Sequence, residues 1–170
     1  MKVKLIAIGK TEEPYLIEGI KEYVSRIQRY LSLEVIEIPG LKNASNLGQK
    51  EWKAKEAKKI LPLFTPKDVV ILLDEKGKEM TSIEFSSFLN QKFNSGSGNL
   101  VFVIGGPYGF DESVRNKAHF RLSLSKMTFS HQMVRLFFLE QFYRALTILR
   151  NEAYHHEWKS WNPCQYLTFL

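Results

Sequence analysis

The sequence predicts an α/β fold in which a mostly parallel sheet carries helices on both faces. Short apolar runs, typical of buried strands, recur at 3–9, 68–74 and 100–104, and a further strand is predicted at 33–38. Segments with helical periodicity alternate with these runs, and the connections are short. The resulting order is βαβαβαβαβα, and we expect one domain over residues 1–170.

Composition narrows the class of protein without naming a function. The 24 Lys and Arg exceed the 18 Asp and Glu, giving a net charge of +6 that is compatible with a polyanionic partner but does not require one. The single cysteine, Cys164, excludes an intrachain disulfide and a cysteine-built metal site. Without a long apolar run or a signal peptide, the protein is expected to be soluble and cytoplasmic, with no membrane partner.

The first strand, 3–9, ends in glycine, and a helix follows it. We expect Thr11 to cap this helix, with Pro14 in its first turn. The second strand, 33–38, stops at a Pro-Gly pair, and the polar residues 41–49 form a surface loop.

A lysine-rich helix is expected from Lys50 onwards. Its inner face is predicted to consist of Trp52, Ala57, Ile60 and Leu61. The lysines on its other side form either a solvated face or a surface that contacts phosphates, and the sequence does not separate the two interpretations.

The third strand, 68–74, is followed by a predicted turn at 75–78. Thr81 and Glu84 have the spacing of a capping box, which opens a helix with Ile83, Phe88 and Leu89 inside. After a loop at 94–99, the fourth strand leads into the segment Gly-Gly-Pro-Tyr-Gly-Phe at 105–110, and Asp111 is expected to cap a short helix.

The stretch 120–156 organises the chain. Leu122 and Leu124 alternate with serines, which indicates a short strand, and a turn follows at 126–129. Ser130 is a good N-cap for one helix over 131–150. That helix is apolar over more than one stripe, so we expect it to be buried on more than one side; its apolar residues are Met133, Leu136, Phe137, Phe142, Ala145, Leu146 and Leu149.

Three strand ends are candidates for a ligand pocket, because ligands of open α/β sheets bind at the carboxyl ends of strands. They are Leu73-Asp74, Gly105-Gly106-Pro107 and Ser125-Lys126-Met127. The glycine pair either opens the backbone to a ligand or only makes a tight turn. Motifs for dinucleotides, P-loop triphosphates and serine nucleophiles are absent from the sequence, so a hydrolase is disfavoured.

Polar residues on the long helix and after it are candidates for a substrate site. Arg135 and Arg144 either clamp phosphates or pair structurally, for example with Glu140. The adjacent pair at 155–156 does not predict a metal site, because neighbouring side chains on a helix diverge. The polar tail around Tyr154 could bind a base.

Three stretches of this chain closely resemble one known family. The stretches are KLIAIGK, VFVIGGPYGF and LSLSKMTFSHQMVRLFFLEQFYRALTILRNEAYHHE. They resemble the bacterial ribosomal RNA large subunit methyltransferase H family, the 23S rRNA pseudouridine N3-methyltransferases of the SPOUT superfamily. The resemblance covers residues 1–157 and implies a C-terminal trefoil knot and a homodimer. Chains of the family end near Tyr154, whereas residues 157–170 continue here as an extension.

The resemblance also implies a cofactor, S-adenosylmethionine, and the residues that bind it. By motif these are Leu73, Gly105, Leu124, Ser125, Lys126, Met127, Thr128 and Phe129. The implied substrate is a pseudouridine of 23S rRNA in the assembled ribosome, with His131, Arg135 and Tyr154 as substrate-binding candidates. A non-catalytic ribosome-binding factor and a nucleotide-binding α/β module are the alternative functions.

The chemistry of N3 methylation suggests two catalytic candidates, because an imide proton must leave as the methyl group arrives. We expect Arg144 to stabilise the developing oxyanion on the base. We expect His155 to position the base or to take its proton.

Overall fold

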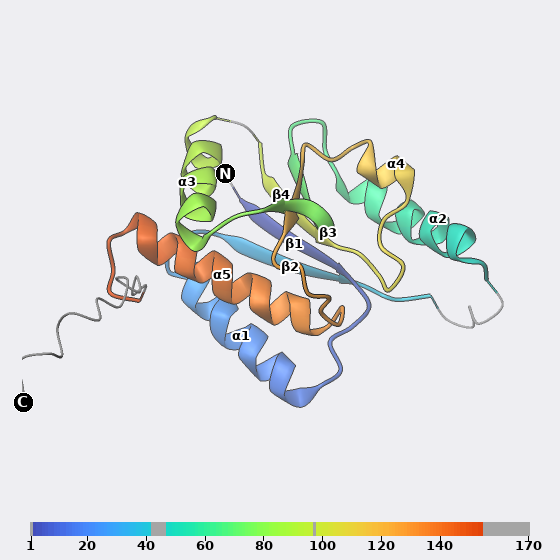
Figure 1. The fold of residues 1–170 in the computed structure, drawn as a ribbon, viewed down its shortest axis with the longest axis horizontal. Coiled ribbons are helices and arrows are strands. Elements are labelled where there is room, and N and C mark those ends of the chain that lie inside the picture. Colours follow the sequence, from blue (N-terminus) through green and yellow to red (C-terminus); the bar gives the residue numbers. More distant parts are fainter. Residues whose placement is uncertain (1, 42–46, 97, 155–170) are drawn as a thin grey trace, which may run out of the picture.

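A five-stranded, entirely parallel sheet forms the centre of the protein (Figure 1). The computed structural model describes residues 2–41, 47–96 and 98–154. The strand order is β2-β1-β4-β3-β5. The strands are β1 (Val3–Ile8), β2 (Leu33–Ile38), β3 (Val69–Glu79), β4 (Leu100–Ile104) and β5 (Phe120–Ser123).

Helices cover both faces of the sheet, which confirms the predicted fold class. On one face lie α1 (Pro14–Gln28), α3 (Ser82–Asn94) and α5 (Met133–Leu149), and on the other lie α2 (Gln49–Ile60) and α4 (Glu112–Arg115). A short 3-10 helix, η1 (Leu61–Leu63), follows α2. None of the helices in the described part of the chain is long and apolar enough to cross a membrane.

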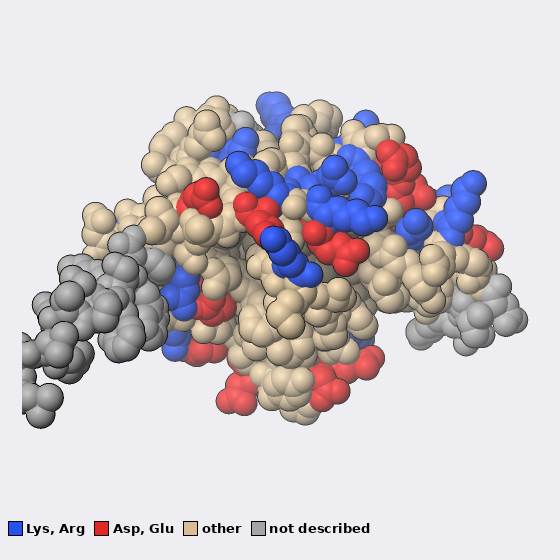
Figure 2. All heavy atoms as spheres, viewed as in Figure 1, with Lys and Arg blue, Asp and Glu red and all other residues tan. Residues whose placement is uncertain are grey.

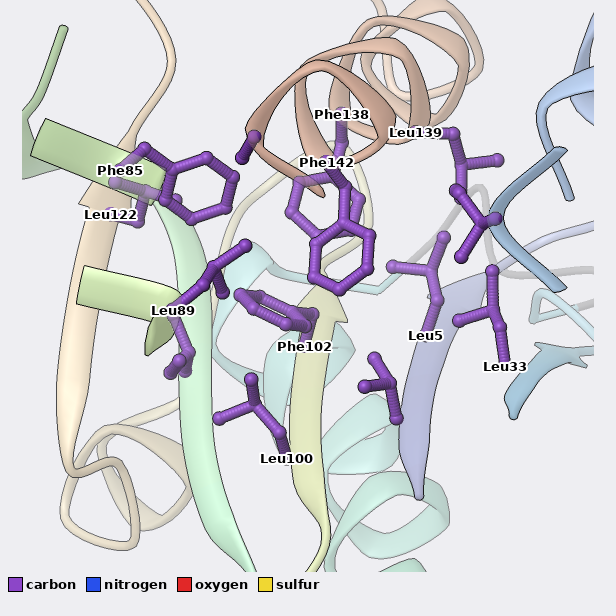
Figure 3. Close-up of a cluster of buried hydrophobic side chains, with 14 of the residues drawn as sticks. Leu5, Leu33, Phe85, Leu89, Leu100, Phe102, Leu122, Phe138, Leu139 and Phe142 are labelled. Carbon is purple, nitrogen blue, oxygen red and sulfur yellow. The ribbon is translucent and has the colours of Figure 1, made fainter. Parts of the chain in front are cut away.

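The larger half of the core lies between the sheet and α5. Phe102 of β4 packs against Phe138 and Phe142 of α5, with ring centroids 4.7 and 5.6 Å apart (Figure 3). All three rings are fully buried. Phe85 of α3 adds a fourth ring 6.4 Å from that of Phe102. The long apolar helix is therefore the main cover of this face, and it contacts both α1 and α3.

Two helices begin later than predicted. α1 starts at Pro14 with Glu13 as its N-cap, because proline's fixed φ suits the first helical position, so the prediction that Thr11 caps it is wrong. α5 starts at Met133 instead of residue 131. The Ser130 hydroxyl nevertheless accepts a hydrogen bond from the backbone N–H of Met133 at 3.2 Å, so it still satisfies a donor of the first turn.

The helix α3 keeps its predicted start, and of the three residues predicted to lie inside, Phe88 and Leu89 pack in the core whereas Ile83 does not. The capping box of Thr81 and Glu84 is present in both directions, as predicted. Ile83, however, is 43% exposed, and Phe85 is buried instead. Leu89 is buried, as predicted.

The predicted turn at 75–78 is wrong, because the chain stays extended and belongs to β3. The cause is a second pairing with β5: Leu122 pairs with Leu73 and also with Lys78. The backbone crosses so closely that a Cβ on Gly77 would lie 2.6 Å from the carbonyl carbon of Leu122. Only glycine fits at this crossing.

Candidate functional site

A pocket of about 670 Å³ lies at the carboxyl ends of β4 and β5 and beside residues 73–76 in the middle of β3. The three strand ends predicted from the sequence meet there, because neighbouring parallel strands end at the same edge of the sheet. Its volume is within the range of small-molecule sites. The lining residues from these segments include Leu73, Asp74, Gly105, Gly106, Pro107, Leu124, Ser125, Met127, Thr128 and Phe129.

Lys126 is the one predicted cofactor-binding residue that does not line this pocket. Its side chain belongs to the same loop but is exposed. The pocket therefore brings together the other seven predicted residues from three separate segments of the chain.

The loop after β5 is held by its own serines. Ser123 donates its hydroxyl to the carbonyl of Ser125 at 2.9 Å, and the Ser125 hydroxyl accepts from the backbone N–H of Met127 at 2.9 Å. The ring of Phe129 packs against that of Phe137 with centroids 4.9 Å apart. These contacts shape the loop before any ligand is bound, while the Met127 side chain is left 76% exposed.

A tight turn, residues 105–109, forms another part of the pocket wall. The backbone N–H of Gly109 donates to the carbonyl of Gly106 at 3.0 Å. Asp111 caps the short helix α4, as predicted, by accepting from the N–H and the hydroxyl of Ser113. The hydroxyl of Ser113 lowers the pKa of Asp111, and its backbone N–H adds to the effect.

Asp74 and Arg115 form a charged pair in the pocket wall. The Arg115 Nη1 and Asp74 Oδ2 are 3.0 Å apart, and the Asp74 side chain is only 5% exposed. Asp74 Oδ1 accepts from the backbone N–H of Lys76 at 3.0 Å. The guanidinium approaches Oδ2 without the direction of a hydrogen bond, so Oδ2 has no donor within the described residues. Sequence reasoning missed Arg115, since its partner lies 41 positions away.

Both positive and negative side chains line the pocket. Lys53 of α2 and Lys76 of β3 are among the lining residues, beside Asp74 and Glu75. Figure 2 shows Lys and Arg side chains gathered in the middle of the view, where Figure 1 shows the strands of the sheet. Lys78, Lys117 and Arg121 are exposed. Within the described residues, no group of three or more His, Cys, Asp or Glu could hold a metal ion.

The predicted substrate-binding residues separate in space. His131 lines the pocket. Arg135 does not: it is 2% exposed and donates to the carbonyl of Ile8 at 2.7 Å, to Glu37 at 3.0 Å and to the Thr11 hydroxyl at 2.8 Å. Burial lowers the pKa of Arg135, and the charge of Glu37 opposes this shift. Arg135 thus ties α5 to the ends of β1 and β2, the structural alternative considered from the sequence.

Arg144 and Tyr154 lie together but outside the pocket lining. Arg144 contacts Glu140 Oε1 through Nε at 3.1 Å and Nη2 at 2.5 Å, and its guanidinium lies 4.8 Å from the ring centroid of Tyr154. The Tyr154 hydroxyl donates to Glu140 at 3.2 Å and lies 3.3 Å from that of Tyr23. Burial raises the pKa of Tyr154, and the bond with Tyr23 adds to the shift. His155 and the extension 157–170 lie outside the described residues.

Comparison with known proteins gives a consistent result along most of the chain. A family model described as predicted SPOUT methyltransferase matches residues 1–155. The ribosomal RNA large subunit methyltransferases H of Parabacteroides distasonis and Flavobacterium johnsoniae are 54% and 53% identical to this chain over 157 residues. That of Bacteroides thetaiotaomicron is 49% identical over the same length. Each match covers 92% of this chain and all of the relative.

Proposed function

The chain belongs to the SPOUT methyltransferase family, and we propose that it methylates N3 of a pseudouridine in 23S rRNA, using S-adenosylmethionine. The observation that carries this proposal is the pocket formed by β3 and the ends of β4 and β5, whose lining includes seven of the eight residues that the family motif assigns to the cofactor. Membership of the family makes the chain a methyltransferase and implies a methyl donor. The ribosomal substrate, the modified atom and the cytoplasmic location are part of the proposal.

The residues present fit a cofactor of this kind. Leu73, Leu124 and Phe129 offer apolar surface for a nucleobase, while the turn after β4 offers open backbone. When bound, S-adenosylmethionine supplies an electrophilic methyl group on a positively charged sulfur. The buried carboxylate of Asp74 is ion-paired with Arg115, so this pair adds no net charge to the pocket wall.

An RNA substrate fits the charged rim of the pocket. Lys53 and Lys76 stand where a phosphate backbone could pass the opening. His131 also lines the pocket and is our candidate for contacting the target base. The exposed lysines thus favour the interpretation in which the basic surface serves RNA binding.

A catalytic role for Arg144 requires a second copy of the chain, because Arg144 is not among the pocket-lining residues of its own chain. We propose a homodimer in which Arg144 and Tyr154 of one protomer reach the pocket of its partner. Exposed apolar side chains support such an interface: Phe137 on α5 is 40% exposed and Tyr15 on α1 is 60% exposed. Light scattering at micromolar concentration tests the assembly, and a strictly monomeric species refutes it.

Calorimetry separates this function from its two alternatives. S-adenosylmethionine is expected to bind and ATP and NAD are not, whereas a ribosome-binding factor would bind none of them. Gly105→Val is expected to weaken cofactor binding, since a Cβ at Gly105 would already lie 3.2 Å from the ring of Phe110. Unchanged affinity in this variant would mean that the cofactor binds elsewhere.

Single-turnover transfer of a labelled methyl group tests the substrate. Assembled ribosomes are expected to be methylated at a pseudouridine N3. Efficient methylation of free 23S rRNA but not of ribosomes, or methylation of an atom other than a pseudouridine N3, would overturn that part of the proposal.

A further inference from the structure

Glu56 is a buried carboxylate directly behind the pocket wall. It is only 3% exposed, although it lies on the lysine-rich helix α2. No ion pair to Glu56 exists within the described part of the chain, and the charge of Lys59 acts on it only from a distance. A buried charge without a directly contacting cation is costly, so the position of this side chain calls for a physical reason.

Trp52 and the glycine turn contact the Glu56 carboxylate. The indole N–H of Trp52, one helical turn earlier, donates to Oε1 at 2.8 Å. The turn at Gly106, which forms one wall of the pocket, lies directly against the carboxylate, and the backbone N–H of Gly106 lowers the pKa of Glu56. Desolvation raises the pKa of Glu56, and these donors and Lys59 lower it again.

The contact between Glu56 and Gly106 leaves no room for a side chain on the turn. A Cβ at Gly106 would lie 2.3 Å from Oε1 and 2.6 Å from Oε2 of Glu56. Trp52 completes the contact between α2 and the turn, because its ring packs edge-on against Tyr108 at 5.4 Å between centroids. The helix α2 therefore contacts the turn at two places: Glu56 lies against the backbone of Gly106, and Trp52 packs against the side chain of Tyr108.

We propose that Glu56 is a positioning residue for cofactor binding, which fixes the Gly105–Gly109 turn by packing its carboxylate against Gly106 and so sets the shape of the pocket wall. This inference rests on the proposed function, because it takes the pocket to be the S-adenosylmethionine site. Trp52 assists Glu56 in this role, because it donates a hydrogen bond to the carboxylate and packs against Tyr108. Position 106 requires glycine, because the Glu56 carboxylate occupies the space that a side chain there would need.

Glu56→Gln tests the proposal, because glutamine keeps the size of the side chain but turns one acceptor into a donor. Calorimetry is expected to show S-adenosylmethionine and S-adenosylhomocysteine binding about tenfold more weakly, as one buried N–H loses its partner. The single-turnover rate at saturating cofactor is expected to stay within about threefold of wild type, since the turn is displaced and not the reacting groups. If Glu56 had a purely structural role, the variant would instead have a lower melting temperature. Its affinity for the cofactor, measured at temperatures where it is folded, would be unchanged.

Gly106→Ala perturbs the same contact from the other side and is expected to weaken cofactor binding too. In the double variant the losses should not multiply, because both remove one interaction. Glu51→Gln is the matched control: this exposed glutamate on α2 pairs with Lys55, and its loss should leave the affinity unchanged. Multiplying losses, wild-type affinity in Glu56→Gln, or an equal loss in Glu51→Gln would each overturn the inference. A wild-type protein that does not bind S-adenosylmethionine would refute the proposed function itself.

Discussion

Replacing Arg144 with alanine distinguishes a catalytic arginine from a structural one. In the folded chain the guanidinium holds Glu140 through two nitrogen atoms and lies over the ring of Tyr154. The side chains of Arg144 and Glu140 are 27% and 18% exposed, so the pair is partly screened by water. Both roles therefore predict some loss of stability, and its size must be worked out first.

The structural loss is small. An ion pair four residues apart on a helix contributes about 0.3–0.5 kcal/mol. The contact with the Tyr154 ring adds about 0.5–1 kcal/mol. Glu140 keeps its donors from Gln141 and Tyr154, so it is not left without partners. The sum is about 1 kcal/mol, which lowers the melting temperature of a protein of this size by about 2–4 °C.

The catalytic loss is much larger. Removing a group that stabilises charge only in the transition state lowers the rate by about a hundredfold or more. The assay is single-turnover methylation of ribosomes at saturating cofactor, with melting curves and light scattering on the same samples. Cofactor affinity is expected to stay unchanged, because Arg144 does not line the pocket of its own chain.

Arg26→Ala is the matched control. Arg26 also pairs with a glutamate four residues away, Glu22, and lies 5.5 and 5.7 Å from the centroids of two tyrosine rings. Its loss should lower the melting temperature by no more than that of Arg144 and leave the rate unchanged. A rate within a few fold of wild type in Arg144→Ala, with the dimer intact, would refute the catalytic assignment.

Three further outcomes follow from the fold. Phe102→Ala removes a fully buried ring that packs on Phe138 and is expected to destabilise the protein by about 3–5 kcal/mol, measured by urea unfolding; a loss below about 1 kcal/mol would contradict the packing. Thr81→Ala breaks the capping box with Glu84 and should cost about 1 kcal/mol, seen as a lower urea midpoint with an unchanged slope. Burial raises the pKa of Glu56, so the folded state is more stable when Glu56 is protonated. The stability of wild type relative to Glu56→Gln should therefore fall as the pH rises above about 4, the ordinary pKa range of glutamate. A difference in melting temperature that does not change with pH would contradict this.

The sequence by itself determined the elements and the place of the pocket. Apolar runs and helical periodicity are local patterns, and so they located the strands and helices, while parallel pairing alone placed the three strand ends at one edge of the sheet. The capping box at Thr81 was readable for the same reason, since its two partners lie three residues apart. The family resemblance rested on contiguous motifs and needed no structure.

Only the tertiary structure decided the features that join distant segments. The continuation of β3 beyond Asp74 depends on a second pairing with Leu122, which no local pattern encodes. The sequence leaves open whether Arg135 clamps a phosphate or pairs structurally, and its partners Thr11, Glu37 and Ile8, which lie about 100 or more positions away, decide for the structural role. No sequence pattern singles out Glu56, which is buried because the glycine turn after β4 packs against it. Whether a charged side chain lies in solvent, binds a ligand or stabilises the fold depends on which segments the topology places beside it.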